Sequence, residues 1–488
     1  MTTPSNGSED RAENEAQTEA MAVEPRKCDL LVRNAHVITM DDERRVISRG
    51  AIAIGGTRIE SVGVEEEVLA SWVSDRTLDA RGAVVHPGFV EAHIHISQHS
   101  SRGALCVFNA PGAVVRYAEW KANLQEHDEF ASTALACVEL LRGGYTAFVD
   151  PGTVFVPDAA AAAAASVGMR GWLADPYLWD RGETLELYPS LISSDLRRRV
   201  PCDLERCQRE LGGQLARNMD ADALVKGHVA LYGESTASDE LQRSAKDRAA
   251  QAGVTFTQHV GFAVEISEAE EARLGKTQVL HMAELGLLDE RTTFVHMNVI
   301  TDDDVGPVTA SRMSIIWCPA NYLCVAAPGG ARTRIPELHR QGTNVALGID
   351  TPGNCTVGDN AAIAYIAARE AGTHVSQHEL LEMQTIGAAR SIGAANEIGS
   401  LQTGKRADLV IRSPDALELI GFDAAFELCM FARSQTVDTV IVNGEVVLRG
   451  GRSTRVDERA VLERAKVSMK SIAARIGLTP SSAWPTLT

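Results

Sequence analysis

The sequence predicts an α/β protein in which a (β/α)8 barrel, a TIM barrel, is joined to a composite β-sandwich domain built from both ends of the chain. Two observations predict this fold. Eight short apolar strand patterns alternate with helical patterns through the middle of the chain, and β-branched strand patterns stand before and after that region. A doubly wound sheet would alternate in the same way, but no strand is followed by the G-x-G-x-x-G pattern of that fold.

The eight strand patterns of the expected barrel lie within residues 87–395. They are VEAHIHI, YTAFVDP, MRGWLADP, ALVKGHVAL, TFTQHVG, TTFVHMN, MSIIWCP and NVALGID. Helical patterns such as ASTALACVELLRGG lie between them and end in glycine, which suits a helix C-cap. Because the carboxyl ends of barrel strands converge on one mouth, polar residues that end these strands are expected to form an active site there.

Strand patterns on both sides of the barrel, at residues 28–86 and 396–452, together predict the β-sandwich. The pair Asn443-Gly444 stands between two apolar runs, which predicts a tight hairpin. Residues 1–27 are polar and acidic and are predicted to be a disordered tail. Residues 453–488 contain an amphipathic helix pattern, which could pack on the barrel or mediate a contact between subunits.

The composition excludes several functional classes. Of the 488 residues 45% are hydrophobic, enough for a large core, and the formal net charge is −18. Such an acidic surface disfavours nucleic acid and anionic membranes as partners, and no apolar run reaches the roughly 20 residues that cross a bilayer. The 9 scattered cysteines, and an N-terminus without an apolar signal-peptide core, predict a cytoplasmic protein. The expected partner is a small-molecule substrate.

His93 and His95 form an H-x-H pattern near the end of the first barrel strand. Residues i and i+2 of a strand point to the same face, so both imidazoles can enter the barrel and hold one metal ion. His259 ends the fifth strand and Asp350 ends the eighth. Together they predict a site for one divalent ion, either zinc, iron, manganese or cobalt, without an organic cofactor.

A metal ion in such a site lowers the pKa of a bound water, which becomes the nucleophile of a hydrolysis. Asp350 is predicted to act both as a metal ligand and as the proton acceptor. His296, which ends the sixth strand, is predicted to orient the attacking water or to polarise the substrate, unless it is itself a ligand.

These motifs resemble the amidohydrolase superfamily, in its cytosine deaminase and triazine hydrolase (TRZ/ATZ-like) branch. HPGFVEAHIHI resembles the first barrel strand of that family, NVALGID the eighth, and IGSLQTGKRADLVI and VIVNGEVV the return into the sandwich. The resemblance covers residues 28–450, approximately, and implies an enzyme that acts on carbon–nitrogen bonds other than peptide bonds and is commonly a homo-oligomer. It also implies the metal ligands, which are His93, His95, His259 and Asp350.

Three positions bear on how far the resemblance extends. Lys226 ends the fourth strand, where other branches carry a carboxylated lysine, which leaves a second metal open. Ring deaminases and triazine hydrolases of this branch carry H-x-x-E after the fifth strand, and its glutamate passes a proton to a ring nitrogen. Phe262 occupies that position here, with Glu265 or His228 as possible replacements. Asn321, after the seventh strand, lies one residue early.

The missing glutamate favours a substrate whose leaving group needs no ring protonation. A urea, carbamate or amide cleaved at a C–N or C–S bond fits, as in the phenylurea and thiocarbamate (molinate) herbicide hydrolases, a xenobiotic-degrading subgroup that the chain also resembles. The alternative is a deaminase or dechlorinase of a triazine, pyrimidine or purine, and a third hypothesis is a non-catalytic scaffold. The substrate pocket is expected to include Phe262, Trp120, Trp179, Tyr188, Trp317 and Asn321.

Overall fold

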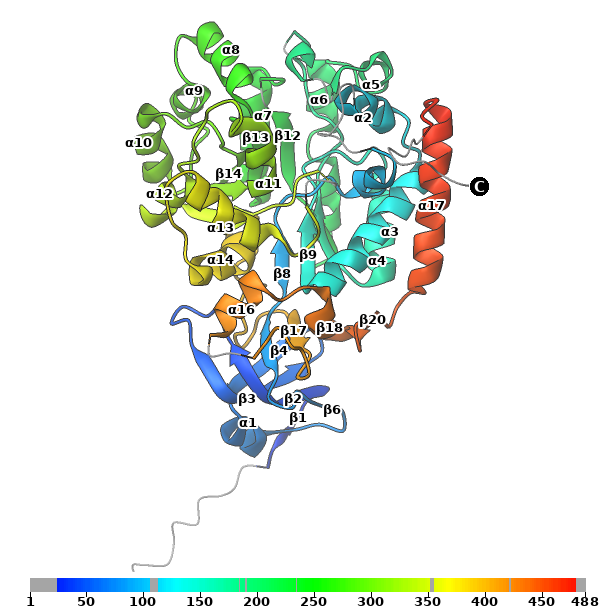
Figure 1. Cartoon of the computed structure of the whole chain (residues 1–488), viewed down its shortest axis with the longest axis vertical. Helices are drawn as coiled ribbons and strands as arrows, with labels where there is room; N and C mark the ends of the chain where they lie inside the picture. The colour runs from blue at the N-terminus through cyan, green and yellow to red at the C-terminus, as the bar shows by residue number, and fades with distance from the viewer. Residues whose placement is uncertain are drawn as a thin grey trace, which may run out of the picture.

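The protein is described by a computed structural model that covers residues 24–105, 113–183, 185–188, 191–233, 235–351, 355–420 and 423–479. A large helical and parallel-stranded part stands above a smaller β domain, which both ends of the chain help to build (Figure 1). Residues 1–23 of the predicted tail and residues 480–488 lie outside the described residues. The tail prediction was wrong at its end, since β1 (Arg26–Lys27) pairs in parallel with β5 (Trp72–Val73).

The larger part is the predicted (β/α)8 barrel. Its strands pair in parallel in sequence order, in one four-stranded and one five-stranded arc. The fourth strand is interrupted at His228, so β11 (Val225–Gly227) ends one arc and β12 (Val229–Gly233) begins the other. The other strands are β8 (Phe89–Glu91), β9 (Tyr145–Val149), β10 (Arg170–Leu173), β13 (Phe256–Val260), β14 (Thr292–His296), β15 (Ser314–Trp317) and β16 (Asn344–Leu347).

The barrel closes just beyond the ends of its first and last strands. The amide of Ala92 donates to the carbonyl of Leu347 (3.3 Å), the amide of Asp350 to the carbonyl of His93 (2.8 Å), and the amide of His95 to the carbonyl of Asp350 (3.2 Å). We call this set of bonds the closing seam. It passes through the backbone of three residues that were predicted to bind the metal, and it holds them side by side.

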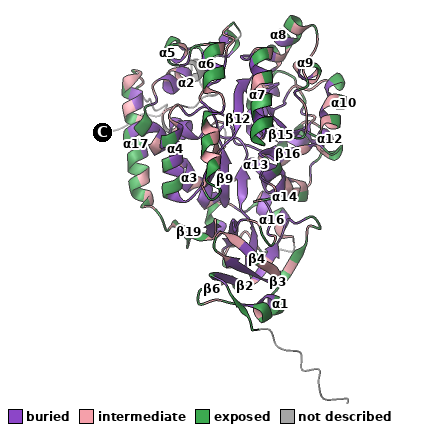
Figure 2. Cartoon of the chain, turned by 180° about the vertical axis from the view of Figure 1, so that it is seen from behind, coloured by how far each residue is buried: buried purple, intermediate pink, exposed green. Residues whose placement is uncertain are grey.

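Helices surround the barrel, with buried residues toward the strands and exposed residues outward (Figure 2). As predicted, α3 (Glu126–Gly143) and α7 (Asp239–Ala252) end at glycines, Gly144 and Gly253, whose left-handed conformation costs glycine little. No helix in the described part of the chain is long and apolar enough to cross a bilayer. The other helices of this part are α2 (Ala113–Ala122), α4 (Pro157–Val167), α5 (Ser194–Arg199), α6 (Leu204–Glu210), α8 (Val264–Leu274), α9 (Gln278–Glu284), α10 (Asp302–Ser311), α11 (Pro319–Asn321), α12 (Ile335–Arg340), α13 (Asn360–Glu370), α14 (Gln377–Gln384) and α15 (Ile386–Ser391).

The smaller domain is a sheet of nine strands from both ends of the chain. Its two halves join where β7 (Val84–Pro87) pairs antiparallel with β17 (Leu409–Arg412). The predicted hairpin turn is present, because Asn443 and Gly444 have φ of 53° and 80° and Val442 pairs with Glu445. The other strands are β2 (Leu30–Ile38), β3 (Val46–Gly55), β4 (Arg58–Val64), β6 (Thr77–Asp79), β18 (Val437–Val442), β19 (Glu445–Arg449) and β20 (Arg452–Ser453), with helices α1 (Glu65–Ser71) and α16 (Ala424–Met430).

A buried ion pair joins the barrel to the sheet. Arg170 on β10 donates two hydrogen bonds to the Asp408 carboxylate, at 2.8 and 3.0 Å. The same carboxylate accepts the amide of Asn443 at 2.7 Å. Both charged side chains are almost fully buried, so each depends on the other for its stability in the folded state.

Asp408→Ala is therefore expected to lower the free energy of unfolding by about 3–5 kcal/mol, because it leaves the Arg170 guanidinium buried without its partner. Urea denaturation measures this loss. The control is Asp415→Ala, which removes an exposed pair with Arg81 and should cost about 0–1 kcal/mol. Equal small losses in both variants would show that the buried pair does not hold the two domains together.

Helix α17 (Glu458–Arg475) runs along the outside of the barrel beside α3, as the red helix of Figure 1 shows. The Ser468 hydroxyl donates to Asp128 of α3 (2.6 Å), and Arg475 bonds to the same carboxylate. Ile472 is fully buried. Of the two roles left open for this segment, the structure shows packing on its own barrel.

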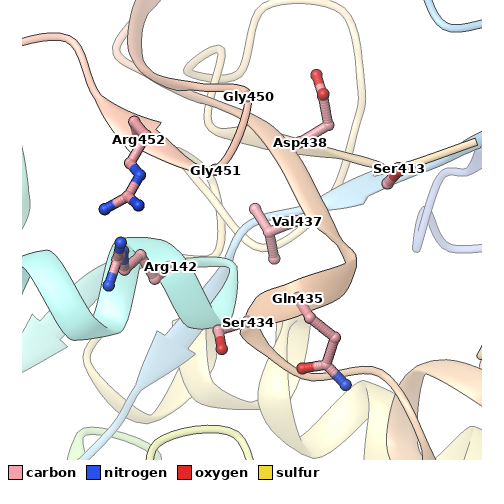
Figure 3. A pocket seen from close by; sticks show the side chains of 9 residues that line it. All are labelled: Arg142, Ser413, Ser434, Gln435, Val437, Asp438, Gly450, Gly451 and Arg452. Atoms are coloured by element: carbon pink, nitrogen blue, oxygen red, sulfur yellow. The ribbon is translucent and has the colours of Figure 1, made fainter. Parts of the chain in front are cut away.

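A surface pocket opens between the end of α3 and the strands β18 to β20 (Figure 3). Arg142 and Arg452 point toward each other there, and both bind the same carboxylate oxygen of Glu458, at 2.9 and 3.0 Å. The two arginines therefore hold the first turn of α17 in place. The pocket lies at the sheet end of the barrel, away from the mouth, and belongs to the joint between the domains.

Candidate metal centre and active site

Four histidines and one aspartate meet at the mouth of the barrel. His93, His95 and His259 bring ligand atoms within 4.8 Å of one another, and His93, His296 and Asp350 form a second, overlapping group. All five side chains are buried. Asp350 Oδ1 lies 3.4 Å from His93 Nε2 and 3.1 Å from His95 Nε2. The structure therefore brings together every residue that was predicted to bind the metal or to lie beside it.

The outward nitrogens of two imidazoles are tied to the surrounding structure. His259 Nδ1 lies 2.6 Å from the carbonyl oxygen of Tyr232. Since a carbonyl only accepts, the proton of His259 sits on Nδ1 and its Nε2 is left with a bare lone pair. His95 Nδ1 lies 2.9 Å from the Thr153 hydroxyl, which is itself 3.3 Å from Asp150 Oδ2. Such contacts fix the orientation of metal-binding histidines.

Thr153→Val is expected to weaken metal binding about 10- to 100-fold, because the His95 ring loses the hydroxyl that orients it. Competition with a chromogenic chelator measures the affinity. Thr153→Ser keeps the hydroxyl and should bind metal close to the wild-type affinity. If Thr153→Val also kept that affinity, the hydroxyl would have no orienting role.

The protonation states at this centre are those of metal ligands. His93 Nε2 is buried without a hydrogen-bond partner among the described residues. Burial lowers the pKa of His93 and of His259, and brings the pKa of His296 to about 3. Burial opposes the ionisation of Asp350, but contact with His93 and His95 outweighs it and holds the Asp350 pKa well below its usual value. Neutral imidazoles beside an ionised carboxylate fit a divalent metal ion.

Two residues of the centre have backbone conformations that L-residues rarely adopt. His296 has a φ of 76° and Asp350 a φ of 65°. Each such residue costs on the order of 1–3 kcal/mol and persists only where its surroundings impose it. The closing seam imposes it at Asp350, and the amide of Met297, which donates to the Val260 carbonyl (2.9 Å), does so next to His296. The fold thus sets both side chains in place before any ligand binds.

A chain of amides fixes the second oxygen of Asp350. Asn321 Nδ2 donates to Asp350 Oδ2 (2.9 Å), and Asn298 Nδ2 donates to Asn321 Oδ1 (3.3 Å). Asn321, predicted to line the pocket, thus lies directly beside Asp350. It ends α11, and a π-helical turn (Tyr322–Ala326) follows, an irregularity that is frequent at functional sites. Asn298 was not predicted from the sequence.

Glu91 also escaped the sequence analysis, although it lies immediately behind the ligands. Its Oε1 accepts the amides of Ile349 (2.7 Å) and His93 (3.3 Å), on the two sides of the closing seam. Burial raises the pKa of Glu91 to about 8. The signal was an acidic residue within the otherwise apolar start of the first strand, two positions before His93.

Two of the predicted aromatic residues lie around the mouth. The Phe262 ring meets the His296 ring edge-on, with centroids 4.9 Å apart. Trp179 packs against Tyr232 (5.6 Å), and Tyr232 in turn contacts His259 (5.0 Å). Phe262 therefore contacts a histidine of the centre directly, and Trp179 is separated from one by a single side chain, that of Tyr232. Tyr188 is buried in the same aromatic cluster as Trp179.

The prediction that Trp317 lines the pocket was wrong. Its neighbours Ile316 and Cys318 face into the barrel, where they lie close to Gly348 and His93. Successive strand residues point to opposite faces, so Trp317 points outward into the core between strands and helices. Trp120 packs with Leu105 in the cluster between α2 and α17, so it supports α2.

The alternative ligands and acids have other contacts. Lys226 bonds to the backbone carbonyl of Asp220 and is half-buried, unlike the five fully buried side chains of the metal centre. Glu265 is exposed on α8. His228 is buried with its Nε2 2.9 Å from the Asp150 carbonyl oxygen. Neither Glu265 nor His228 replaces the missing glutamate in this geometry.

Comparison with known proteins identifies the family. Residues 84–447 match the model of the Amidohydrolase family. The chain belongs to the amidohydrolase family. It is therefore a hydrolytic enzyme, and the third hypothesis, a scaffold without catalysis, has no support.

Proteins with similar sequences match nearly the whole length of this amidohydrolase. The 5'-deoxyadenosine deaminase of Methanosarcina mazei is 26% identical over 470 residues, which are 92% of this chain and 99% of that protein. The 5-methylthioadenosine/S-adenosylhomocysteine deaminase of Syntrophobacter fumaroxidans is 27% identical over 470 residues, 91% of this chain and 99% of that protein.

Solved structures share the fold. An adenosine deaminase from Xanthomonas campestris with bound zinc has a TM-score of 0.79 at 23% identity, over 92% of this chain and 100% of that one. An atrazine chlorohydrolase from Arthrobacter aurescens TC1 complexed with zinc has a TM-score of 0.76 at 22% identity, over 90% of this chain and 100% of that one. None of these four relatives adds support for the suspected resemblance to phenylurea and thiocarbamate hydrolases.

Proposed function

We propose that this amidohydrolase uses one divalent metal ion to release ammonia from an amino-substituted nitrogen heterocycle of the adenosine type. The geometry supports it through the imidazoles of His93, His95 and His259, gathered around the ionised Asp350 carboxylate. The choice of bond rests on two relatives named as adenosine-type deaminases, which match over 91% or more of this chain. Deamination, the alternative in the sequence analysis, thereby moves ahead of urea or carbamate cleavage.

The residues of the metal centre have distinct roles in this reaction. His93, His95 and His259 would hold the metal ion through their Nε2 atoms, and Asp350 through Oδ1. When bound, a divalent ion supplies a water-derived nucleophile at neutral pH. Asp350, whose Oδ2 is kept in place by Asn321, accepts a proton from the attacking water and returns it to the departing nitrogen.

His296 has a separate role in this proposal. Burial keeps its imidazole neutral, and its Nδ1 has no partner among the described residues. One ring nitrogen can therefore form a hydrogen bond with the reacting centre of the substrate as charge develops there.

One observation favours a second candidate function. The position that holds an acid in ring deaminases holds Phe262, whose ring lies against His296. A phenyl group cannot give a proton to a ring nitrogen. Ureas, carbamates and thiocarbamates need no such proton, so cleavage of their acyl C–N or C–S bond is the second candidate.

Product analysis decides between the two. Metal-loaded enzyme is incubated with 5'-deoxyadenosine, an aminotriazine, a phenylurea and a thiocarbamate, beside a chelator-treated control. Ammonia with a hydroxylated ring supports the first proposal, and a free amine or thiol supports the second. A failure to release any of these products in a metal-dependent way would overturn both.

Phe262→Glu tests the meaning of the phenylalanine. If the missing acid limits ring chemistry, this variant gains rate on amino heterocycles on the order of 10²-fold, the usual contribution of a positioned proton donor. Phe262→Leu, which keeps the position apolar, should show no gain. Equal rates in both variants would mean that the acid of this proposal comes from another residue.

A further inference from the structure

Asn298 is a buried side chain at the mouth that the mechanism above does not use. It lies two residues after His296, just beyond the end of β14, and is only 1% exposed. Its Nδ2 donates to the backbone carbonyl of Phe262 (3.0 Å) and to Asn321 Oδ1 (3.3 Å). Its Oδ1 has no hydrogen-bond partner in the described part of the chain. Asn298 therefore acts on its surroundings as a donor.

The direction in which the Asn321 amide faces is decided by its two neighbours. The oxygen and the nitrogen of a side-chain amide differ little in shape, and a half-turn exchanges them. Asn321 Nδ2 donates to Asp350 Oδ2 at 2.9 Å, while its Oδ1 accepts from Asn298. In the opposite orientation an oxygen would face the carboxylate, and two NH₂ groups would face each other. Asp350 and Asn298 therefore select the same orientation, in which Asp350 receives a donor.

The backbone of Asn298 is fixed independently of its side chain. Its amide donates to the carbonyl of Gly261 (2.9 Å), which also accepts the amide of Val299 (3.1 Å). Gly261 has a φ of 65° and lies directly after β13. These bonds join the ends of β13 and β14, so removal of the side-chain donors of Asn298 should leave its backbone in place.

The two bonds of the Asn298 side chain lead to different parts of the site. One holds the carbonyl of Phe262, whose ring meets that of His296 with centroids 4.9 Å apart. The other leads through Asn321 to Asp350. Hydrogen bonds weaken steeply when their angles depart from the preferred geometry. A turn of the Asn321 amide would therefore change the direction in which the Asp350 oxygens are held.

We propose that Asn298 is a positioning residue that makes Asn321 present its NH₂ group to Asp350. Through the same Nδ2 it holds the Phe262 segment, which is expected to line the substrate pocket. One side chain thereby links the wall of the pocket to the proton acceptor. This inference rests on the proposed function for the metal ion and for the role of Asp350.

The visible absorption spectrum of the Co²⁺-loaded enzyme tests the proposal, because its d–d bands respond to the arrangement of the ligands. Asn298→Leu has a similar shape but neither a donor nor a charge, and it is expected to shift these bands. Asn321→Ala should shift them as well. The variant with both changes should match Asn321→Ala alone, since two residues that act through one path are not additive.

Asn344→Leu is the matched control. Asn344 begins β16, at the other end of the barrel, and its Nδ2 likewise donates two hydrogen bonds, to Ser314 Oγ (3.0 Å) and to the carbonyl of Gly387 (2.9 Å). Its replacement should leave the cobalt bands at their wild-type positions. If Asn344→Leu shifts the bands as far as Asn298→Leu, the effect is a general loss of structure and the proposal is wrong.

Steady-state kinetics on the substrate found by product analysis separates the two bonds of Asn298. Asn321→Ala should lower kcat about 10- to 100-fold, as the loss of a hydrogen bond to a charged group allows, with KM nearly unchanged. Asn298→Leu should lower kcat and also raise KM, because Phe262 loses its anchor. An unchanged KM in Asn298→Leu would contradict the part of the proposal that concerns Phe262.

Cobalt bands of Asn298→Leu that coincide with those of the wild type would overturn the proposal. Asn298→Ala replaces Asn298→Leu should the latter fail to fold, with the same expected shift. The spectra require no turnover. A failed product analysis would therefore overturn the proposed reaction and leave this result standing, and unchanged spectra would overturn the role of Asn298 without touching the reaction.

Discussion

Asp350→Asn is expected to lower the turnover of the metal-loaded enzyme about 10²- to 10⁴-fold, the usual contribution of a general acid–base group. Asparagine has nearly the same shape and retains an oxygen that can face His95, but it cannot accept the proton of the attacking water. Turnover number and bound metal are measured on the same preparation, so that loss of chemistry is separated from loss of the ion.

Asp415→Asn provides the matched control, because Asp415 is an exposed carboxylate in the sheet domain and should leave turnover unchanged. An Asp350→Asn enzyme that retained full metal and wild-type turnover would contradict the role of Asp350 as proton acceptor. The proton path would then have to run through another residue of the centre.

His259→Ala is expected to abolish stoichiometric metal binding and, with it, activity. The Tyr232 carbonyl holds the His259 ring in place at 2.6 Å, and alanine removes the nitrogen that this contact orients toward the metal. Metal stabilises the wild type by mass action, about 4 kcal/mol at a free metal concentration 1,000 times the Kd. Thermal unfolding with and without chelator should therefore show a large shift for the wild type and almost none for the variant.

His281→Ala is the control for that experiment. His281 is a partly buried histidine on α9 that pairs with Asp239 at 2.9 Å, and it takes no part in the metal-ligand groups of the described chain. Its removal should leave metal content and the chelator-dependent shift at wild-type values. A His259→Ala enzyme with the same shift would show that the ion binds elsewhere.

Most of the barrel could be predicted because its signals are local. Strand patterns, helix periodicity and the capping glycines at Gly144 and Gly253 each depend on a few neighbouring residues. The ligands could be predicted for a similar reason, since parallel strands bring their carboxyl ends together whatever the detailed packing.

The direction of side chains on buried strands could not be predicted. The segment MSIIWCP is apolar throughout, as strands covered on both faces usually are. It contains no alternation that separates Trp317 from Ile316 and Cys318. Asn321 could be placed near the centre, but its bond to Asp350, 29 residues later, depends on how the ends of two strands pack together in the folded chain.

Glu91 and Asn298 were missed because their contacts depend on tertiary structure. Glu91 bonds to Ile349 and Asn298 to Asn321, and only the folded chain brings these residues together. The sequence alone favoured urea or carbamate cleavage over deamination, because Phe262 stands where ring deaminases carry a glutamate. Relatives that match nearly the whole chain favour deamination.

The closing seam has a consequence for the order of folding. It joins residues from opposite ends of the barrel sequence, and the Glu91 carboxylate beside it bonds to Ile349, 258 residues away. Contacts of such long range form late, because loop-closure entropy must be overcome first. His93 and Asp350 come together only at this step. Metal uptake during refolding would therefore report the final closure of the barrel, after most helices and strand pairs have already formed.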